Sequence, residues 1–296
     1  MNIGHLNPDH EELAQRLQHD DDYRVLRAVP KPYCAMPENG APPNGKCIAI
    51  VDTETTGLDP DNDTIIELAI MHVFVDDNGE LLGHFGPFSW LQDPGEALDP
   101  RIARITGLDA QQLAGQKIDD AFAFSLLDRA DLIVAHNSAF DVGFIERRYP
   151  EIEGLAWACS CSEIDWLGLG FDRRGQQHLL SQAGWFSGAH RAGDDVWSLF
   201  WLLQQRQRDP RGGAERTHLA RLLEASETPT VMLQAEGAPY STKDKLKARG
   251  YRWNADRRFW QCEFPADKVE HEQAWAYRNG LRMLTERATT ACNRHR

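Results

Sequence analysis

Two carboxylates end a short apolar run near residue 50 and raise the question of what balances their charge. Residues 48–57 read IAIVDTETTG, so four apolar residues precede Asp52, and Glu54 follows two positions later. Side chains alternate between the two faces of a strand, and both acids are therefore expected to point the same way. Like charges at the edge of a core repel each other and lose hydration unless a positive charge lies between them. The pattern predicts a bound cation.

Two more acids fall at the boundaries of expected elements. Asp141 comes shortly after the apolar run at 132–137, and Asp195 lies at the start of an amphipathic helix. Sites in open α/β sheets gather where strands end, so both acids can converge on Asp52. Carboxylates are hard oxygen donors of the kind that suit Mg²⁺ or Mn²⁺. Considered singly, each of these two acids could instead stabilise a helix N-terminus.

The acids lie in three motifs that resemble those of a known family. Residues 52–57 (DTETTG), 136–141 (HNSAFD) and 190–195 (HRAGDD) are similar, in this order, to the three motifs of the DEDDh 3′–5′ exonucleases. The resemblance covers about 47–206 and is strongest to the proofreading epsilon subunit of bacterial DNA polymerase III and its stand-alone relatives. It implies a ribonuclease H-like fold and hydrolysis of phosphodiester bonds from the 3′ end of DNA, releasing nucleoside 5′-monophosphates with two divalent cations, Mg²⁺ or Mn²⁺.

The same resemblance implies a role for each motif residue. The implied metal ligands are Asp52, Glu54, Asp141 and Asp195, with Asp52 bridging both cations. His190 would be the general base, because a group that titrates near neutrality can take the proton of the attacking water. The family places its histidine and last aspartate five positions apart, which selects Asp195 rather than the adjacent Asp194.

Contacts to the substrate are also implied by the resemblance. The candidates are Thr53, Thr55, Thr106, Asn137 and Phe140. Phe140 could equally pack in the core, and His136 could pack or hydrogen bond. Many relatives have a histidine before a Gly-Ile segment, whereas this chain has Arg104 followed by Ile105.

Hydrophobic patterns predict the elements that position these residues. Strands are expected at 47–53, 64–75 and 80–91, as successive antiparallel neighbours. A helix near 119–129 leads to the apolar run at 132–137, and a strand reached through a helix is usually parallel to its neighbours. Ser138 is expected to cap the next helix. Helices near 175–184 and after 195 then complete an α/β sandwich with a mixed sheet.

The chain is expected to hold more than one domain. The predicted divisions are an N-terminal helix and linker at 1–46, the exonuclease domain at 47–206, a linker at 207–227, a small α+β module at 228–278 and a tail at 279–296. Asp9 is expected to cap the first helix, with Glu12 completing a capping box.

Basic and aromatic residues alternate between 241 and 261. Seven basic residues against two acids give this segment a net charge of +5, inside a chain of −13. Cations for phosphates and flat rings for bases are the combination that single-strand binders use. The predicted contacts are Lys243, Lys247, Arg257 and Arg258. Alternatively, the aromatics form a small core and the lysines are its solvated face.

Composition restricts the remaining possibilities. A net charge of −13 argues against general adhesion to nucleic acid. The sequence has neither an apolar run of transmembrane length nor a leader, so we expect no membrane and a cytoplasmic location. The six cysteines form no Cys-x-x-Cys pair and are expected to be reduced.

The expected partner is DNA with single-stranded or frayed 3′ ends. RNA trimming is an alternative, and a noncatalytic binding module is another. The sequence leaves open whether a polymerase or repair protein binds the chain.

Overall fold

The computed structural model describes residues 6–38, 40–188, 190–255 and 257–296. They divide into two compact units, the first formed by residues up to 223 with 295–296 and the second by 224–294. None of the described helices is both long and apolar enough to span a membrane.

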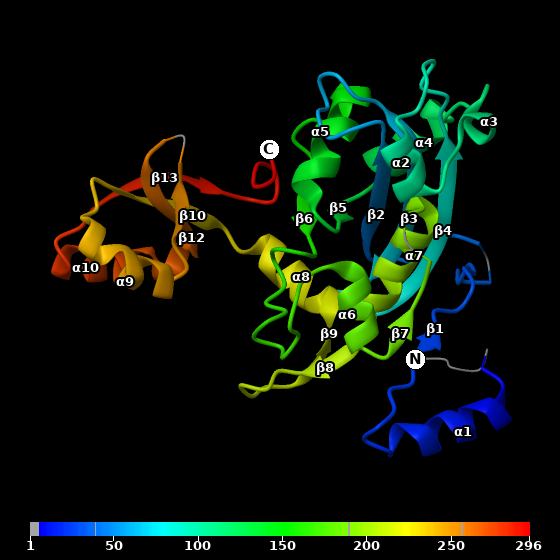
Figure 1. The fold of residues 1–296 in the computed structure, drawn as a ribbon, viewed down its shortest axis with the longest axis horizontal. Helices are drawn as coiled ribbons and strands as arrows, with labels where there is room; N and C mark the ends of the chain where they lie inside the picture. The colour runs from blue at the N-terminus through cyan, green and yellow to red at the C-terminus, as the bar shows by residue number, and fades with distance from the viewer. Residues whose placement is uncertain (1–5, 39, 189, 256) are drawn as a thin grey trace. The chain divides into compact units, whose positions relative to one another are not determined.

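A five-stranded mixed sheet forms the centre of the first unit, with the order β4-β3-β2-β5-β6 (Figure 1). Its strands are β2 (Lys46–Thr55), β3 (Ile65–Val75), β4 (Leu81–Leu91), β5 (Leu132–Ala135) and β6 (Trp157–Cys159). The first three pair in antiparallel fashion, and β5 and β6 run parallel to β2. The three predicted antiparallel strands and the predicted parallel strand at 132–137 are confirmed. Strand β6 was not predicted, because its three residues are too few to show a pattern.

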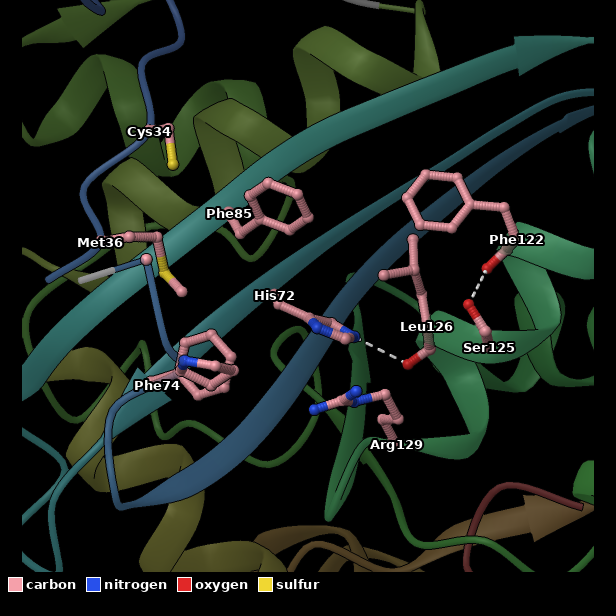
Figure 2. Close-up of a pocket in the computed structure, with 11 residues that line it drawn as sticks. Cys34, Met36, His72, Phe74, Phe85, Phe122, Ser125, Leu126 and Arg129 are labelled. Carbon is pink, nitrogen blue, oxygen red and sulfur yellow. Dashed lines mark hydrogen bonds between the residues drawn. The ribbon is translucent and has the colours of Figure 1, made fainter. Parts of the chain in front are cut away.

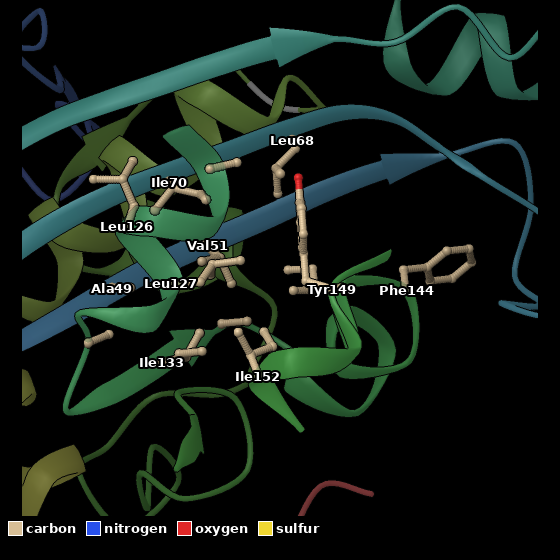
Figure 3. Packing of buried hydrophobic residues seen from close by; sticks show 14 of the residues in the cluster. Ala49, Val51, Leu68, Ile70, Leu126, Leu127, Ile133, Phe144, Tyr149 and Ile152 are labelled. Atoms are coloured by element: carbon tan, nitrogen blue, oxygen red, sulfur yellow. The ribbon is translucent and has the colours of Figure 1, made fainter. Parts of the chain in front are cut away.

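Helices cover both faces of this sheet. Ala49 and Val51 of β2 belong to a buried cluster with residues of α4 (Asp120–Asp128) and α5 (Ser138–Arg148), which cover one face (Figure 3). The other face packs against α7 (Ala192–Leu203). Because neighbouring residues of β2 point to opposite faces, the strand supplies core to both layers. Asp52 and Glu54 fall on the α7 side.

The N-terminal segment covers α7 and is more than a linker. Nine of the twelve residues of this helix are buried. The indole of Trp197 donates to the carbonyl of Pro30 at 2.6 Å, and the ring of Tyr33 lies 5.4 Å from the Trp197 ring. Strand β1 (Arg27–Ala28) pairs in parallel with β7 (Trp185–Phe186). Burial of the outer side of α7 explains why that helix is apolar all round.

Two predicted helix caps are wrong. The helix α1 (Pro8–Gln18) is capped by Asn7, whose side chain accepts from the amides of Asp9 and His10. Ser138 does not cap α5, because its hydroxyl is buried and donates to the carbonyls of Ala135 and Ala158. Asp9 is the second residue of α1 and Ser138 is the first residue of α5, so both lie within their helices rather than before them.

Short helices fill the connections of the first unit. They are α2 (Pro100–Thr106), α3 (Ala110–Leu113), a 3-10 turn (Pro150–Ile152) and α6 (Gln176–Gln182). The last of these agrees with the helix expected near 175–184.

Residues 207–223, predicted to belong to a linker, are part of the first unit. Strands β8 (Arg206–Arg208) and β9 (Glu215–Thr217) form a hairpin, and α8 (His218–Glu227) follows. Leu219 and Leu222 of α8 are completely buried. The sequence was interpreted as a tether with a short amphipathic helix, and the helix packs on the first unit because its apolar side chains have a core to enter.

The second unit is a four-stranded antiparallel sheet in the order β11-β12-β10-β13, with two helices. Its elements are β10 (Thr230–Glu236), a 3-10 turn (Tyr240–Thr242), α9 (Lys243–Ala248), β11 (Arg252–Asn254), β12 (Phe259–Pro265), a 3-10 turn (Ala266–Lys268), α10 (Val269–Arg278) and β13 (Arg282–Thr289). The last strand corrects the expected tail at 279–296, because β13 pairs with β10 along its length.

A cavity of about 430 Å³ lies at the end of β3 that is remote from the acids (Figure 2). Its lining includes His72, Phe74 and Phe122, and the ring of His72 bonds the carbonyl of Leu126 at 2.7 Å. His72 pairs with Ala49, three residues before Asp52. The cavity is therefore separate from the acid group described below.

Candidate active site

Three carboxylates lie together where β2 meets α7. Asp52 and Glu54 come from β2, and Asp195 comes from the first turn of α7. Carboxylate oxygens of the three residues lie within 4.8 Å of one another. The strand alternation thus places both β2 acids on the face that the helix acid approaches, as the sequence predicted.

Burial and mutual repulsion disfavour the charged forms of these acids. The pKa of Asp52 lies well above its usual value because of burial and of the charges of Asp141 and Asp195. Burial, with Asp195 adding to it, raises the pKa of Glu54 to about 7. The pKa of Asp195 is also raised by burial. A divalent cation would favour ionisation of this oxygen-only donor set, so the residues present fit such an ion.

Asp141 approaches from the other face of β2. It lies in the first turn of α5, and its Oδ1 accepts a hydrogen bond from Thr53 Oγ1 at 2.8 Å. Burial raises the pKa of Asp141 to about 7, although the bond from Thr53 lowers it. Asp141 is not one of the three acids within 4.8 Å, yet its charge acts on Asp52. The structure therefore gathers four acids, three of them closely.

His190 is exposed and sits on the connection that leads into α7. Its backbone has φ of 63°, in the left-handed region that non-glycine residues seldom adopt. Its amide donates to Asp195 Oδ2 at 2.8 Å. The hydrogen bond offsets the cost of this conformation and ties the histidine to a candidate ligand.

An ion pair next to His190, between a buried carboxylate and a partly exposed arginine, was not anticipated from the sequence. Glu67 of β3 is 2% exposed and accepts from Arg191 Nε at 2.9 Å, and Ser89 Oγ donates to it at 2.8 Å. The Ala192 amide also lies 3.3 Å from Glu67. An acid within the apolar run TIIELAIM was the available signal, since a carboxylate there must have a partner. The pair fixes the residue that follows the histidine.

The threonines predicted to contact substrate have internal partners. The Thr53 hydroxyl bonds Asp141, and that of Thr55 donates to the carbonyl of Gly57 at 2.5 Å. Thr106 is buried at the end of α2 and donates to the carbonyl of Ile102 at 3.0 Å. These hydroxyls order the protein, and any contact to substrate would come from the backbone.

The second motif places its residues in different environments. Asn137 is exposed, has φ of 112° and makes no side-chain cap to α5. Phe140 is half-buried against the core, with its ring 5.0 Å from that of Phe144. His136 bonds Ser160 Oγ and the carbonyl of Arg174, both at 2.8 Å, and burial lowers its pKa to about 4. The packing interpretation of His136 agrees with these contacts.

The basic candidates of the second unit lie around α9 and the β11–β12 turn. Lys243 and Lys247 are on α9, and Arg257 and Arg258 precede β12. Arg249, counted in the basic segment, pairs with the buried Glu272. The free positive charge of the segment is therefore smaller than its composition indicates.

Comparison with known proteins matches part of the first unit. Residues 49–160 match the sequence model of RNase_T, described as exonuclease. A DNA polymerase III of the PolC type from Listeria welshimeri is 36% identical over 105 residues, which are 35% of this chain and 7% of that protein. One from Streptococcus pyogenes is 33% identical over 102 residues, or 34% and 7% of the two chains. The chain thus spans a small part of the length of these relatives.

Two solved structures found by comparison are exonucleases. Exonuclease I of E. coli in complex with a dA16 oligonucleotide is 16% identical, with a TM-score of 0.49 over 80% of this chain and 68% of the other. Exonuclease X in complex with 5′ overhanging duplex DNA is 23% identical, with a TM-score of 0.39 over 60% and 90%.

The match at 49–160 is to a model described as exonuclease, and it falls on the five-stranded mixed sheet of the first unit. Within that class, the matched segments of the curated relatives belong to DNA polymerases of the PolC type. The third motif, at 190–195, lies outside the matched residues.

Proposed function

We propose that this chain is a metal-dependent 3′–5′ exonuclease that releases nucleoside 5′-monophosphates from the 3′ ends of DNA. The observation that carries the proposal is the group of Asp52, Glu54 and Asp195, whose oxygens lie within 4.8 Å in a unit matched to exonucleases. A cation would favour the ionised forms of these acids, whose pKa values are raised, and hydrolysis of phosphodiesters commonly uses such ions.

The four acids would hold two divalent cations, Mg²⁺ or Mn²⁺. When bound, these ions would lower the pKa of the attacking water and stabilise the leaving 3′ oxygen. The protein orients the ligands in advance: Thr53 holds Asp141, and the amide of His190 holds Asp195. Gln177 Nε2 lies 3.3 Å from Asp195 Oδ1 and restrains the same carboxylate. Such outer contacts keep the oxygens directed at one point.

His190 is the proposed general base. Its ring is exposed, so it can reach a water at the acid group, and its backbone is held by Asp195. The Glu67–Arg191 pair fixes the next residue and limits how far the histidine can turn away. The imidazole would take the proton from the attacking water as the new P–O bond forms.

DNA is the proposed substrate because the curated relatives are named as DNA polymerases. RNA trimming is the alternative, and contacts to the 2′-hydroxyl would distinguish the two. A polymerase partner is a hypothesis with the same basis. A noncatalytic module is disfavoured, since a binding protein does not need five residues of a hydrolytic site.

A degradation time course tests this proposal. End-labelled single-stranded DNA, duplex DNA with a mismatched 3′ end, and RNA are incubated with the protein, with and without Mg²⁺. We expect Mg²⁺-dependent shortening of DNA from the 3′ end, lost in the Asp52→Asn variant. Faster shortening of RNA than of DNA would reverse the substrate assignment. No shortening with either Mg²⁺ or Mn²⁺ would refute the enzyme.

A further inference from the structure

The second unit gathers its exposed aromatic rings at one end of its sheet. The register aligns Ala235 of β10 with Trp260 of β12 and with Met283 of β13, and Trp260 aligns with Trp253 of β11. Immediately beyond this row lie the loop after β10, the β11–β12 turn and the connection between α10 and β13. Segments distant in sequence therefore meet at one end of the sheet.

Three large aromatic side chains at this end face solvent. Tyr240, in the loop after β10, is 84% exposed, and Tyr277, in the last turn of α10, is 85% exposed. Trp253 is 51% exposed, with its ring 5.6 Å from that of Trp260. Lys245 Nζ on α9 donates to Asn279 Oδ1 at 3.1 Å, which confirms that the loops around Tyr240 and Tyr277 belong to one region. Exposed aromatic rings gathered at one end of a sheet, with polar residues around them, are typical of a binding surface.

Cations lie in the same segments of the chain as these rings. They are Lys243, Arg257, Arg258, Arg278 and Arg282. The ammonium of Lys243 lies 5.1 Å from the centre of the Tyr240 ring, and the Arg257 guanidinium lies 5.7 Å from that of Phe259. These contacts hold long side chains beside flat rings. We call this set of rings and cations the aromatic-basic end.

The opposite end of the same sheet carries both acids and cations. Glu263, near the end of β12, accepts hydrogen bonds from Thr230 and Thr289, and Arg294 and Lys268 also lie at this end. Asp267 and Glu270 lie at the start of α10 and are exposed. At the aromatic-basic end the described acids Glu236 and Asp244 are outnumbered by the cations. The balance of charge therefore differs between the two ends of the sheet, with cations in excess at the aromatic-basic end.

We propose that the aromatic-basic end binds single-stranded DNA, with bases on Tyr240, Tyr277 and Trp253 and phosphates on the cations around them. A chain of net charge −13 repels nucleic acid at long range, so a local positive region is needed for contact. Stacking tolerates any base, and a duplex would hide the base faces that these rings need. The surface goes beyond the proposed hydrolysis, because it retains a strand without cleaving it.

Binding is measured with the full chain carrying Asp52→Asn, so the result does not depend on hydrolysis. The probe is a fluorescent 40-nucleotide oligothymidylate, titrated at several salt concentrations. The first variant carries Lys243→Glu and Arg258→Glu. Its control carries Lys31→Glu and Lys268→Glu, which changes the net charge equally at exposed positions elsewhere. The second variant carries Tyr240→Ala and Tyr277→Ala.

We expect the charge variant to bind more weakly and to lower the slope of log affinity against log salt by about 1.4, since each phosphate contact contributes about 0.7 on single strands. The control should keep the wild-type slope. The tyrosine variant should lose affinity about fivefold or more per ring with its slope unchanged. Both tyrosines are too exposed to support the core, and a melting curve verifies folding.

Equal slopes for the charge variant and its control would overturn the proposal, as would full affinity in the tyrosine variant. Tighter binding of oligouridylate than of oligothymidylate would overturn the assignment to DNA. Failure of the wild type to hydrolyse DNA would count against the proposed enzyme and leave this binding result unaffected.

Discussion

The two units differ in the sign and the exposure of the charged side chains that they gather. In the first, Asp52, Glu54 and Asp195 come together on a covered face of the sheet. In the second, cations such as Lys243 and Arg258 stand at an exposed end. Part-buried acids that repel each other are relieved by protonation or by a bound cation, whereas cations at the surface keep their water and attract phosphates weakly and in a salt-dependent manner. Burial therefore separates a site built for an ion from a surface built for a strand.

The largest expected effect on hydrolysis follows removal of the charge of Asp52. Asp52→Asn should reduce hydrolysis of single-stranded DNA by several orders of magnitude, because the neutral amide is a poor ligand for a bridging cation. Without metal, the variant should be at least as stable as the wild type, since a repulsive charge is gone. Rates in Mg²⁺ and melting in EDTA measure the two effects. Wild-type turnover in the variant would exclude Asp52 from the mechanism.

The next effect concerns the proposed base. His190→Ala should lower the rate by roughly 10²–10⁴-fold, the usual contribution of a general base, with nearly unchanged affinity for divalent metal. Alanine keeps the amide that bonds Asp195 at 2.8 Å, so the ligand geometry is retained. Calorimetry with Mn²⁺ provides the affinity. If the ion is lost together with activity, His190 has a ligand role instead.

A smaller effect is expected from the ion pair that positions the histidine. Glu67→Gln and Arg191→Met should each reduce kcat about 10-fold, the lower range for outer contacts in metal sites, with little change in KM. The double variant should be no slower than either single variant, because both break one contact. Ser89→Ala, which removes a single hydrogen bond to Glu67, serves as the mild control. Additive losses would mean that the two residues act separately.

The smallest effect contrasts the stability of the two units in acid. His84 is fully buried among aromatic rings, its ring nitrogens have no hydrogen-bond partner among the described residues, and burial lowers its pKa to about 4. A folded pKa below the unfolded value of about 6.5 means that its contribution to stability is complete above pH 6.5 and is lost as the pH falls toward 4. The loss at pH 5 amounts to about 2 kcal/mol for this residue.

His84→Leu should remove that pH dependence, and it should also raise stability at pH 7, because two unsatisfied polar atoms are replaced by apolar ones. Hydrogen exchange resolved along the chain compares the units, since the described histidine of the second unit, His271, is exposed. Acid should therefore open the first unit before the second. Equal pH dependence in the variant and the wild type would show that His84 is not responsible.

Hydrophobic patterns predicted the central sheet, but they did not predict elements whose structure depends on distant partners. The run at 64–75 is almost continuously apolar, which is typical of a strand covered on both faces. It forms β3, in which all eleven residues are buried. Residues 282–289 form a full strand whose sequence, RMLTERAT, has no apolar alternation. Pairing with β10 decides its structure. The same holds for α8, whose burial depends on a partner distant in sequence.

The three clustered acids could be predicted from the sequence, but the contacts that hold the neighbouring residues in place could not. Residue types and spacing brought Asp52, Glu54 and Asp195 together without coordinates. The Glu67–Arg191 contact joins residues 124 apart, and no local rule connects them. The basic segment at 241–261 was predicted from its charge, but only the structure brings α9 beside the end of α10, through the bond between Lys245 and Asn279.

The alternation of β2 has a consequence for how this sequence can vary. Asp52 and Glu54 serve one layer, while Thr53 between them holds Asp141 in the other. A substitution at any of these positions alters one contact. An in-frame insertion or deletion of one codon between 48 and 52 would send both acids into the apolar layer beside Val51 and turn Thr53 away from Asp141. The length of this strand is therefore more strictly limited than its composition. Substitutions are expected to be tolerated here far more often than the insertion or deletion of a residue.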